Sequence, residues 1–411
     1  MTIYEVIGMI VGIIGGGASG MAAALAASNH PHVQVLLFER QARVGRKLLA
    51  TGNGRCNLTN LHANGNSYHG TAPEFAQYAL SQMDPQATLQ WFSDLGLYTV
   101  SEPSGRVYPY SDQANSVVDV LRLGLERPNV QLITGYDVQR IKKTEEGFLI
   151  SDGETDYTAD KLIIACGGLA GTKLGGTMSG YKLLAKFGHR STKLRPTLVQ
   201  LKSSWSALAA LKGVRANCHV QILHEGELFS QSTGEVQFTD YGLSGPVIFE
   251  ISRDVCAKSG TWVAVLDLLP QLTRQQLLKE LLRRKESALP VQELLTGILH
   301  NRLGRVLTQA VGIPMNLYCR ELSQVQLEAV CNGVKQFEVT LTEPMGMENA
   351  QVTAGGVLTD QFCDRTMESK LVPGLYACGE VLDIDGDCGG YNLQWAWSSG
   401  YLAGSAAGKE V

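Results

Sequence analysis

The sequence predicts a mixed α/β fold, α+β overall, in which a glycine-rich α/β domain is interrupted by two inserted units. An apolar run at 10–16 leads directly into a glycine turn and a helix of small residues, which is the pattern of a parallel βαβ unit. After about residue 192 the pattern changes to short alternating runs and then to helical periodicity, and glycine-rich strand ends return near residue 345. We therefore expect a discontinuous domain over 1–192 and 345–411, a β-barrel-like unit over 193–270 and a helical subdomain over 271–344.

Composition narrows the class of protein. The chain has 411 residues, enough for two or three domains, and its 44% hydrophobic and 18% charged residues are typical of a globular protein. Its net charge of −4 comes from 35 basic and 39 acidic residues without a long block of either sign, which argues against a nucleic-acid partner. The apolar run at 10–16 is too short to span a bilayer and has no cleavage-like end. We expect no signal peptide, no membrane association and a cytoplasmic protein, with residues 1–8 forming an extension before the first strand.

The cysteines and histidines indicate neither a metal site nor a disulfide framework. The nine cysteines are odd in number and no two have Cys-x-x-Cys spacing, so we predict reduced thiols. Cys56 has no neighbouring cysteine with which to relay electrons. The eight histidines are scattered without metal-ligand spacing, and we predict no metal site.

Strands and helices can be assigned in order along the chain. The runs at 10–16 and 33–39 are predicted to be parallel strands joined by a helix at 18–29. Helical patterns follow near 72–95 and 113–126. Further runs predict strands, with a small antiparallel sheet beside the main one, at 130–134, 137–143, 147–151 and 162–166. In the insertion, alternating runs predict strands at 214–223, 234–239 and 262–268, and leucines at helical spacing follow over 272–337. We interpret the basic residues among these leucines, over 279–285, as a solvated helix face.

The turn after the first strand has the form Gly15-x-Gly17-x-x-Gly20. Such a turn lets the backbone approach a pyrophosphate at the N-terminus of the following helix. The second apolar run ends at Glu39, where a carboxylate accepts hydrogen bonds from the ribose of an adenine dinucleotide. The pattern predicts a dinucleotide site with phosphate-binding residues at Gly15, Gly17, Ala18, Ser19 and Gly20.

Two later strand ends and a helix start indicate the same kind of ligand. The run at 161–166 ends near Ala165 and Gly167, and the run at 375–378 leads into Gly379 and Glu380. Gly390 then opens a helix whose first N–H groups, at 390–393, are expected to face the pyrimidine edge of a flavin, where negative charge collects on reduction. Together with the first turn, these segments predict FAD.

The segment at 45–57 supplies further candidates. Lys47 and Arg55 are candidates to offset phosphate or flavin charge, and Asn53 and Asn57 are candidates to bind the ring edge. The set of candidate cofactor residues is completed by Arg40, Arg46, Thr51, Val138, Tyr391, Asn392 and Leu393. The candidate catalytic residues are Arg55, Asp240, Tyr241 and Tyr391.

These motifs resemble those of the BaiN/YhiN-type bacterial flavoproteins, a family often labelled NAD(P)/FAD-dependent oxidoreductase or aminoacetone-oxidase-like. The resemblance covers nearly the full length and includes Gly-Arg-Lys-Leu-Leu-Ala-Thr-Gly-Asn-Gly-Arg-Cys-Asn at 45–57 and Gly-Asp-Cys-Gly-Gly-Tyr-Asn-Leu-Gln at 386–394. It implies a Rossmann-like FAD-binding domain of the two-dinucleotide-binding type, with barrel-like and helical insertions, and FAD at Gly15, Gly17, Gly20, Glu39, Lys47 and 390–393. The segment at 168–181 departs from the family pattern, because Ser179 stands where relatives carry Asp and a Tyr-Pro pair is missing.

We therefore expect an FAD-dependent oxidoreductase that acts on a small organic substrate. The main hypothesis is NAD(P)H-linked reduction of an activated double bond, with NAD(P)H visiting the flavin transiently because the sequence has one strong dinucleotide fingerprint. The alternatives are an oxidase of an aminoacetone-like amine that passes electrons to O2, and a flavin-dependent RNA-modification factor. We expect neither nucleic acid nor membrane as a partner, and a monomer or homodimer.

Overall fold

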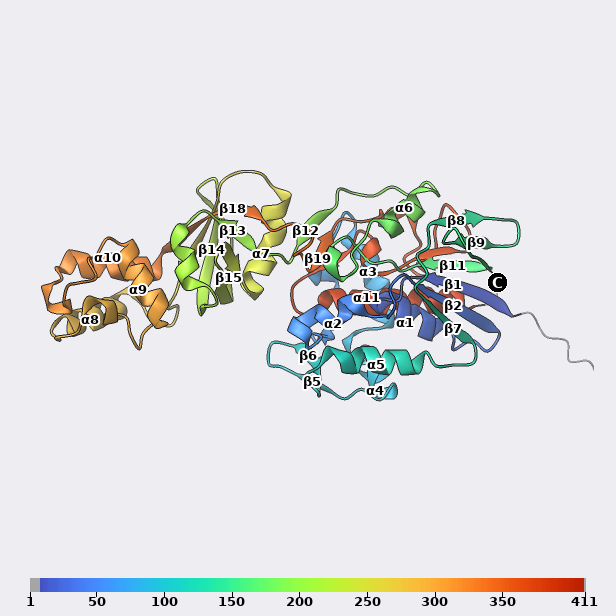
Figure 1. The fold of residues 1–411 in the computed structure, drawn as a ribbon, viewed down its shortest axis with the longest axis horizontal. Helices are drawn as coiled ribbons and strands as arrows, with labels where there is room; N and C mark the ends of the chain where they lie inside the picture. Colours follow the sequence, from blue (N-terminus) through green and yellow to red (C-terminus); the bar gives the residue numbers. More distant parts are fainter. Residues whose placement is uncertain (1–7, 410–411) are drawn as a thin grey trace, which may run out of the picture. The chain divides into compact units, whose positions relative to one another are not determined.

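The computed structural model describes residues 8–409 and divides the chain into two compact units. Unit 1 comprises Met1–Arg195 and Met347–Val411, and unit 2 comprises Pro196–Gly346. In Figure 1, unit 1 holds the blue-to-green part and the red end of the chain, and unit 2 holds the yellow-green to orange part. Of the extension expected at 1–8, residues 1–7 lie outside the described residues.

Unit 1 is built on a five-stranded parallel sheet with the strand order β20-β11-β1-β2-β7. The strands are β1 (Met9–Ile14), β2 (Val33–Glu39), β7 (Val130–Thr134), β11 (Lys161–Ile164) and β20 (Leu375–Ala377). Ile14 at the end of β1 pairs with Phe38 of β2 and Ile164 of β11, so these strands end at one edge of the sheet. The predicted parallel α/β core is confirmed, and in such sheets ligands bind at the carboxyl ends of the strands.

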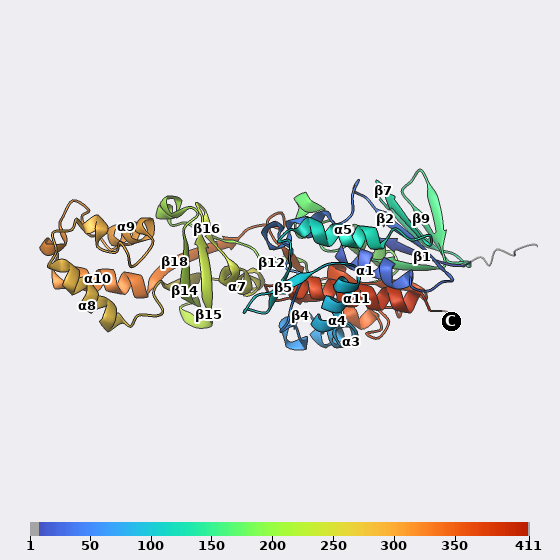
Figure 2. The ribbon, with the colours of Figure 1, turned by 90° about the horizontal axis from the view of Figure 1, so that it is seen from below.

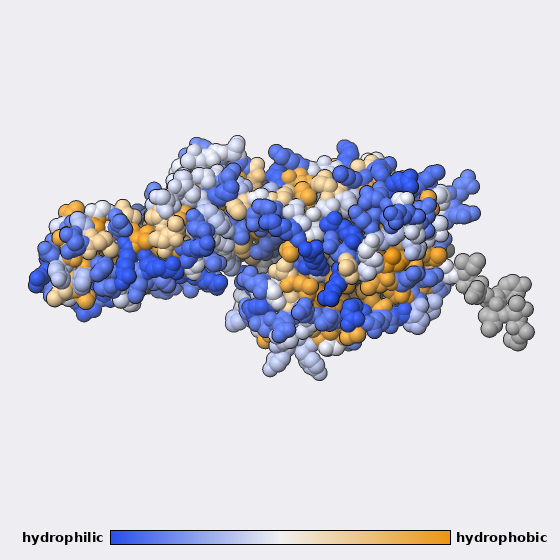
Figure 3. Space-filling view, in the orientation of Figure 1, coloured by the Kyte–Doolittle hydropathy of each residue, from blue (hydrophilic) through white to orange (hydrophobic). Residues whose placement is uncertain are grey.

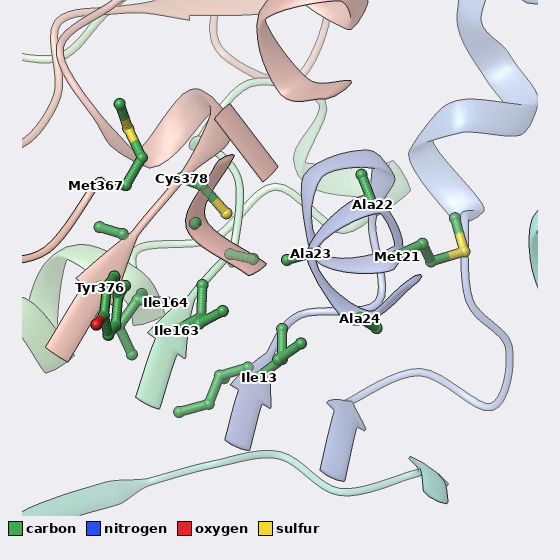
Figure 4. Packing of buried hydrophobic residues seen from close by; sticks show 14 of the residues in the cluster. Ile13, Met21, Ala22, Ala23, Ala24, Ile163, Ile164, Met367, Tyr376 and Cys378 are labelled. Atoms are coloured by element: carbon green, nitrogen blue, oxygen red, sulfur yellow. The ribbon is translucent and has the colours of Figure 1, made fainter. Parts of the chain in front are cut away.

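Helices α1 (Ala18–Ala27) and α11 (Tyr391–Ala407) pack closely against each other, and Figure 2 shows them side by side. Two glycines of α11 permit the approach. A Cβ atom on Gly400 would lie 2.3 Å from the Ser19 carbonyl oxygen, and one on Gly404 would lie 2.1 Å from the Ala23 carbonyl oxygen. Figure 4 shows the alanines of α1 beside the strands that carry Ile13 and Ile163. The small residues of both helices are therefore a packing requirement.

Smaller elements surround this core. The helices are α2 (Arg46–Ala50), α3 (Ala76–Gln82), α4 (Pro85–Asp94), α5 (Ala114–Gly124) and α6 (Ser179–Ala185). The strands are β3 (Thr59–Asn60), β4 (Tyr68–His69), β5 (Thr99–Ser101), β6 (Arg106–Pro109), β8 (Arg140–Lys143), β9 (Phe148–Ser151), β10 (Asp156–Ala159), β19 (Val352–Ala354) and β21 (Asp385–Gly386), with β12 (Arg195–Thr197) at the division between the units. The single helical pattern at 72–95 forms two helices, because Asp84 caps α4 and Pro85 begins it.

Unit 2 is a closed barrel with the strand order β13-β16-β15-β14-β17-β18, together with four helices, which confirms the barrel-like insertion. The strands are β13 (Leu201–Ser203), β14 (Arg215–His224), β15 (Glu227–Phe238), β16 (Gly242–Ser244), β17 (Trp262–Asp267) and β18 (Phe337–Pro344). The helices are α7 (Pro246–Ala257), α8 (Arg274–Lys285), α9 (Asn301–Ala310) and α10 (Gln324–Lys335).

One boundary in unit 2 differs from the expected one. Residues 337–344, assigned from sequence to the helical subdomain, form β18, because Phe337, Val339 and Leu341 alternate into the barrel core. The helical segment therefore interrupts the barrel between β17 and β18.

Within residues 8–409, no helix combines the length and the apolar character that a membrane crossing requires. On the face drawn in Figure 3, hydrophilic side chains cover most of the surface, with apolar ones between them.

Candidate functional site

The three glycines of the first turn have different surroundings. Gly15 has a φ of +114°, and a Cβ atom there would lie 2.4 Å from the Ala165 carbonyl oxygen. A Cβ atom on Gly20 would lie 1.8 Å from the Gly15 carbonyl oxygen. At Gly17, in contrast, a Cβ atom would meet nothing within 4 Å. The first and third glycines are therefore required by the packing of the chain on itself, and the second faces open space of the kind a ligand fills.

The start of α1 is suited to an anion. No side chain caps this helix and its first turn holds no acidic residue. Its first N–H groups therefore point toward the open space at Gly17, where the helix dipole favours negative charge. Glu39 supports the turn, because its Oε2 accepts a hydrogen bond from the Gly16 amide at 2.8 Å and its Oε1 accepts one from the Gln41 amide at 2.7 Å.

Two further strand ends reach the same edge of the sheet. Ala165 follows β11, and Gly167 has a φ of +68° with nothing within 4 Å of a Cβ position. Gly379 follows β20, and a Cβ atom there would lie 2.4 Å from Ser19 Oγ of α1. The Gly379 amide donates to Ser399 Oγ of α11 at 3.0 Å. The structure thus brings together the glycine turn, Ala165, Gly167 and Gly379.

Lys47 and Glu380, predicted as separate cofactor contacts, bind each other. Lys47 Nζ of α2 lies 2.7 Å from Glu380 Oε2, and both side chains are half-buried. Glu380 Oε1 also accepts a hydrogen bond from the Thr353 amide of β19 at 2.8 Å. The pair therefore ties three segments of unit 1 together, and its charges offset each other.

The start of α11 forms a second potential anion site. Gly390 has a φ of +104°, and a Cβ atom there would lie 2.4 Å from the Thr59 carbonyl oxygen and 3.0 Å from Asn57 Oδ1. No side chain caps α11, and its first turn holds no acidic residue. Asn57 Oδ1 is buried and has no hydrogen-bond partner, which is unusual for a buried acceptor. The Asn392 side chain is occupied, since it bonds to the amide and carbonyl of Gly386.

Six other predicted cofactor residues lie in different settings. Arg40 donates to the Gly175 carbonyl at 2.9 Å, and Arg46 donates to Gln41 Oε1 at 2.9 Å. The Thr51 hydroxyl donates to the Leu48 carbonyl at 2.7 Å. Asn53 is exposed, Val138 is buried and Leu393 is half-buried. The hydrogen bonds of Arg40, Arg46 and Thr51 are thus made within the protein, so their predicted cofactor contacts gain no support from the structure.

The four catalytic candidates are divided between the two units. Arg55 pairs with Asp112 and Glu102 and lies 3.9 Å from the centre of the Tyr108 ring, so its charge is offset by two acidic side chains. Tyr391 is the first residue of α11 and packs edge-on against Tyr68.

Asp240 and Tyr241 lie in unit 2. Asp240 Oδ2 is 2.8 Å from Lys212 Nζ, and this hydrogen bond lowers the pKa of the Asp240 carboxyl, which makes it a poor proton donor. Tyr241 is exposed. The catalytic roles assigned from sequence to these four residues stay predictions.

Cys56, Cys166 and Cys378 are free thiols. Burial raises the pKa of Cys56 to about 12, and it raises the pKa values of Cys166 and Cys378 to about 12 as well. Thiols of this kind remain protonated near neutral pH and are poor nucleophiles. Among residues 8–409, no group of three or more potential ligands is arranged to hold a metal ion.

One pair near the start of α11 was not found from sequence. His69 Nε2 of β4 lies 2.7 Å from Asp387 Oδ1, in the loop after β21. The two residues are 318 positions apart, and strands of two residues each bring them together. No periodic signal marks strands so short, so the sequence offered nothing that would have found this pair.

The fold and the open glycine cradle define a Rossmann-type dinucleotide-binding protein. The chain belongs to the HI0933-like protein Rossmann domain family, whose profile matches residues 9–406. A 3-dehydro-bile acid delta(4,6)-reductase from Clostridium scindens is 42% identical, over 97% of this chain and 98% of its own. A ribosomal RNA dihydrouridine synthase from Escherichia coli is 33% identical, over 95% of each chain.

This membership confirms the family resemblance drawn from the motifs and makes the chain an FAD-dependent oxidoreductase. Among solved structures, a 3-ketosteroid delta1-dehydrogenase from Sterolibacterium denitrificans is 12% identical with a TM-score of 0.49, over 97% of this chain and 99% of that one. That likeness is too distant to bear on the substrate.

Proposed function

We propose that this protein binds FAD in the cradle at Gly17 and uses NAD(P)H to reduce a carbon–carbon double bond conjugated to a carbonyl in a small organic substrate. The observation that carries the proposal is the open cradle, bordered by the ends of β1, β11 and β20 and by an uncapped helix. The relatives support the reaction class, since a delta(4,6)-reductase of a 3-dehydro-bile acid and a dihydrouridine synthase both saturate such a bond.

The described residues fit this cofactor. Gly17 and the first turn of α1 would hold the pyrophosphate, and Glu39 would accept the ribose hydroxyls. Asn57 and the first turn of α11 would hold the flavin ring edge, because Asn57 Oδ1 is a buried acceptor that needs a donor.

The chain's contribution to the chemistry is electrostatic and positional. Bound FAD supplies hydride transfer. The first N–H groups of α11 stabilise negative charge at the ring edge, and no acidic side chain in that turn opposes them. The protonated, buried thiol of Cys56 supports direct transfer between nicotinamide, flavin and substrate without a thiol relay.

A small substrate is favoured over RNA by the charges of unit 2. This unit has equal numbers of basic and acidic residues. On α8, Arg283 and Arg284 both pair with Glu280, which offsets part of the positive charge of that helix. RNA modification is the second candidate function, favoured by the Escherichia coli relative.

Anaerobic transient kinetics test the proposal. The purified protein is expected to carry FAD, with absorbance bands near about 370 and 450 nm. NADH or NADPH should bleach the flavin, and a conjugated 3-oxo-Δ4,6-steroid should then restore its colour and gain two mass units. If the reduced flavin reacts with O2 but not with the steroid, and an aminoacetone substrate reduces it, the protein is an amine oxidase. If only ribosomal RNA restores the colour, it is an RNA-modifying enzyme.

A further inference from the structure

The His69–Asp387 pair is accessible and lies beside the predicted flavin site. The His69 side chain is 36% exposed and that of Asp387 45%. Residues 381–386 are buried, whereas residues 387–393 are half-exposed, so the chain reaches the surface at Asp387 and stays there through the first turn of α11. The pair therefore opens onto the same surface as the helix start.

Three contacts hold the His69–Asp387 pair next to the start of α11. In the pairing of β4 with β21, His69 lies opposite Asp385 and Tyr68 lies opposite Gly386. The Tyr68 hydroxyl donates to the Tyr391 carbonyl at 3.0 Å. Asn392 Nδ2 donates to the Asp387 carbonyl at 3.2 Å. These contacts connect the pair to the start of α11.

The surrounding titratable groups are less suited to giving a proton. Burial raises the pKa of Tyr68 well above its usual range, and its proton is engaged by the Tyr391 carbonyl. Asp383 is buried and accepts two hydrogen bonds from Thr71, and Asp385 is buried under the strand pair. Asp387 itself is engaged by the histidine. His69 is therefore the accessible side chain here that can hold and release a proton on one ring nitrogen while the other keeps a hydrogen bond.

We propose that His69 is the proton donor for the substrate carbon and that Asp387 is the residue that positions it. This inference rests on the proposed function. Reduction of a conjugated double bond needs a hydride at the carbon distant from the carbonyl and a proton at the carbon beside it. A hydrogen bond from Nε2 to Asp387 orients the imidazolium, so Nδ1 gives up its proton and the neutral ring keeps the proton on Nε2. The carbon–carbon double bond is reduced by two electrons, which the reduced FAD would supply. NAD(P)H would then reduce the FAD again.

The test separates proton delivery from electron transfer. Wild type, His69→Gln and Asp387→Asn are reduced anaerobically with NADPH or dithionite, and the flavin is then reoxidised with 2-cyclohexenone or with ferricyanide. Ferricyanide takes electrons without a proton being placed on carbon. Reoxidation by the enone should slow by about 10²- to 10⁴-fold in His69→Gln and by about tenfold in Asp387→Asn, whereas reoxidation by ferricyanide should not change.

Three controls make the result specific. His62, an exposed histidine in the preceding loop, is replaced in His62→Gln, which should behave as wild type. Flavin content and the flavin spectrum of the His69 and Asp387 variants should match wild type, which shows that the site is intact. In His69→Ala, added imidazole should restore part of the enone rate, because it supplies the missing acid.

The outcomes distinguish the two proposals. If wild type reduces the enone and His69→Gln does so at the same rate, the assignment of His69 is wrong and the proposed function stands. If the variant slows the enone and ferricyanide reactions equally, His69 has only a structural role. If wild-type reduced flavin is not oxidised by the enone at all, the proposed function and this inference both fail.

Discussion

At the scale of single residues, the same amino acid is required by packing at one position and borders open space at another, three residues away. Gly20 has no room for a methyl group because the Gly15 carbonyl oxygen would lie 1.8 Å from it. Gly17 has room, because nothing lies within 4 Å. The glycine pattern in the sequence does not distinguish the two cases.

This difference gives the first prediction. Gly17→Val should fold with nearly the thermal stability of the wild-type apoprotein, yet lose nearly all bound FAD, because its side chain fills the space proposed for the pyrophosphate. Gly20→Ala should instead lower the free energy of unfolding by about 1–3 kcal/mol. Absorbance at the flavin band and thermal unfolding of the apoproteins measure both effects. Full flavin content in Gly17→Val would mean that the pyrophosphate lies elsewhere.

His189 gives a prediction about pH. This buried histidine bonds through Nδ1 to the Leu184 carbonyl at 3.1 Å and through Nε2 to Ser369 Oγ at 2.9 Å, and burial lowers its pKa. Because its pKa is lower in the folded state, the unfolded state binds the proton more readily, and stability falls as the pH drops below the unfolded value of about 6.5. Urea unfolding between pH 7.5 and 5 should show a smaller loss in His189→Gln than in wild type. The exposed-site variant His62→Gln should retain the wild-type loss, and an unchanged slope in His189→Gln would refute this account.

At the scale of elements, α11 connects the predicted ring site to the core. Gln394 of this helix is fully buried, and its Oε1 accepts the Thr59 hydroxyl while its Nε2 donates to the Met83 carbonyl at 2.7 Å. Gly390 at its start passes close to Thr59, and Gly404 near its end passes close to Ala23 of α1. The position of the helix start is therefore set by contacts along its whole length.

A substitution at Gly404, where α11 contacts α1, tests whether this contact sets the position of the helix start. Gly404→Val would place a side chain against the backbone of α1, and we expect a loss of at least about 2 kcal/mol in the free energy of unfolding together with weaker FAD binding. Ser405→Val, at the neighbouring half-exposed position of the same helix, is the control and should cost a few tenths of a kcal/mol, about the difference in helix propensity. Equal losses in the two variants would show that the α1–α11 contact does not matter.

At the scale of the molecule, residues 8–409 form two separate hydrophobic cores, one in each unit. Gly17, Ala165, Gly167 and Gly379, which form the cradle, belong to unit 1. The free energy of cofactor binding is therefore expected to stabilise that unit selectively.

Calorimetry of the apoprotein with and without FAD tests this expectation. We predict two unfolding transitions, of which only one moves upward with FAD, by the equivalent of about 2.7 kcal/mol at a hundredfold excess over Kd. A matched titration with Gly17→Val should move neither. A single transition that shifts as a whole would contradict the separation of the cores.

Much of the architecture was predictable because it is encoded locally. The apolar run of β1, the glycine turn and the small residues of α1 are adjacent in sequence, and the alternating runs of the insertion do form a barrel. The assignment of 337–344 to the helical subdomain was wrong because an alternating strand directly follows a helix there. Whether Lys47, Glu380 or Asn57 contacts the cofactor remains a prediction.

The sequence by itself determined the parallel α/β core, the family and the place where a dinucleotide would be sought, since hydrophobic period and glycine spacing are properties of neighbouring residues. Only the tertiary structure decided that Lys47 binds Glu380, that Arg55 is held by surface acids and that His69 meets Asp387. The two residues of each pair come from chain segments far apart in sequence. The free energy that selects such partners comes from the packing of the whole unit, and no local sequence pattern contains this information.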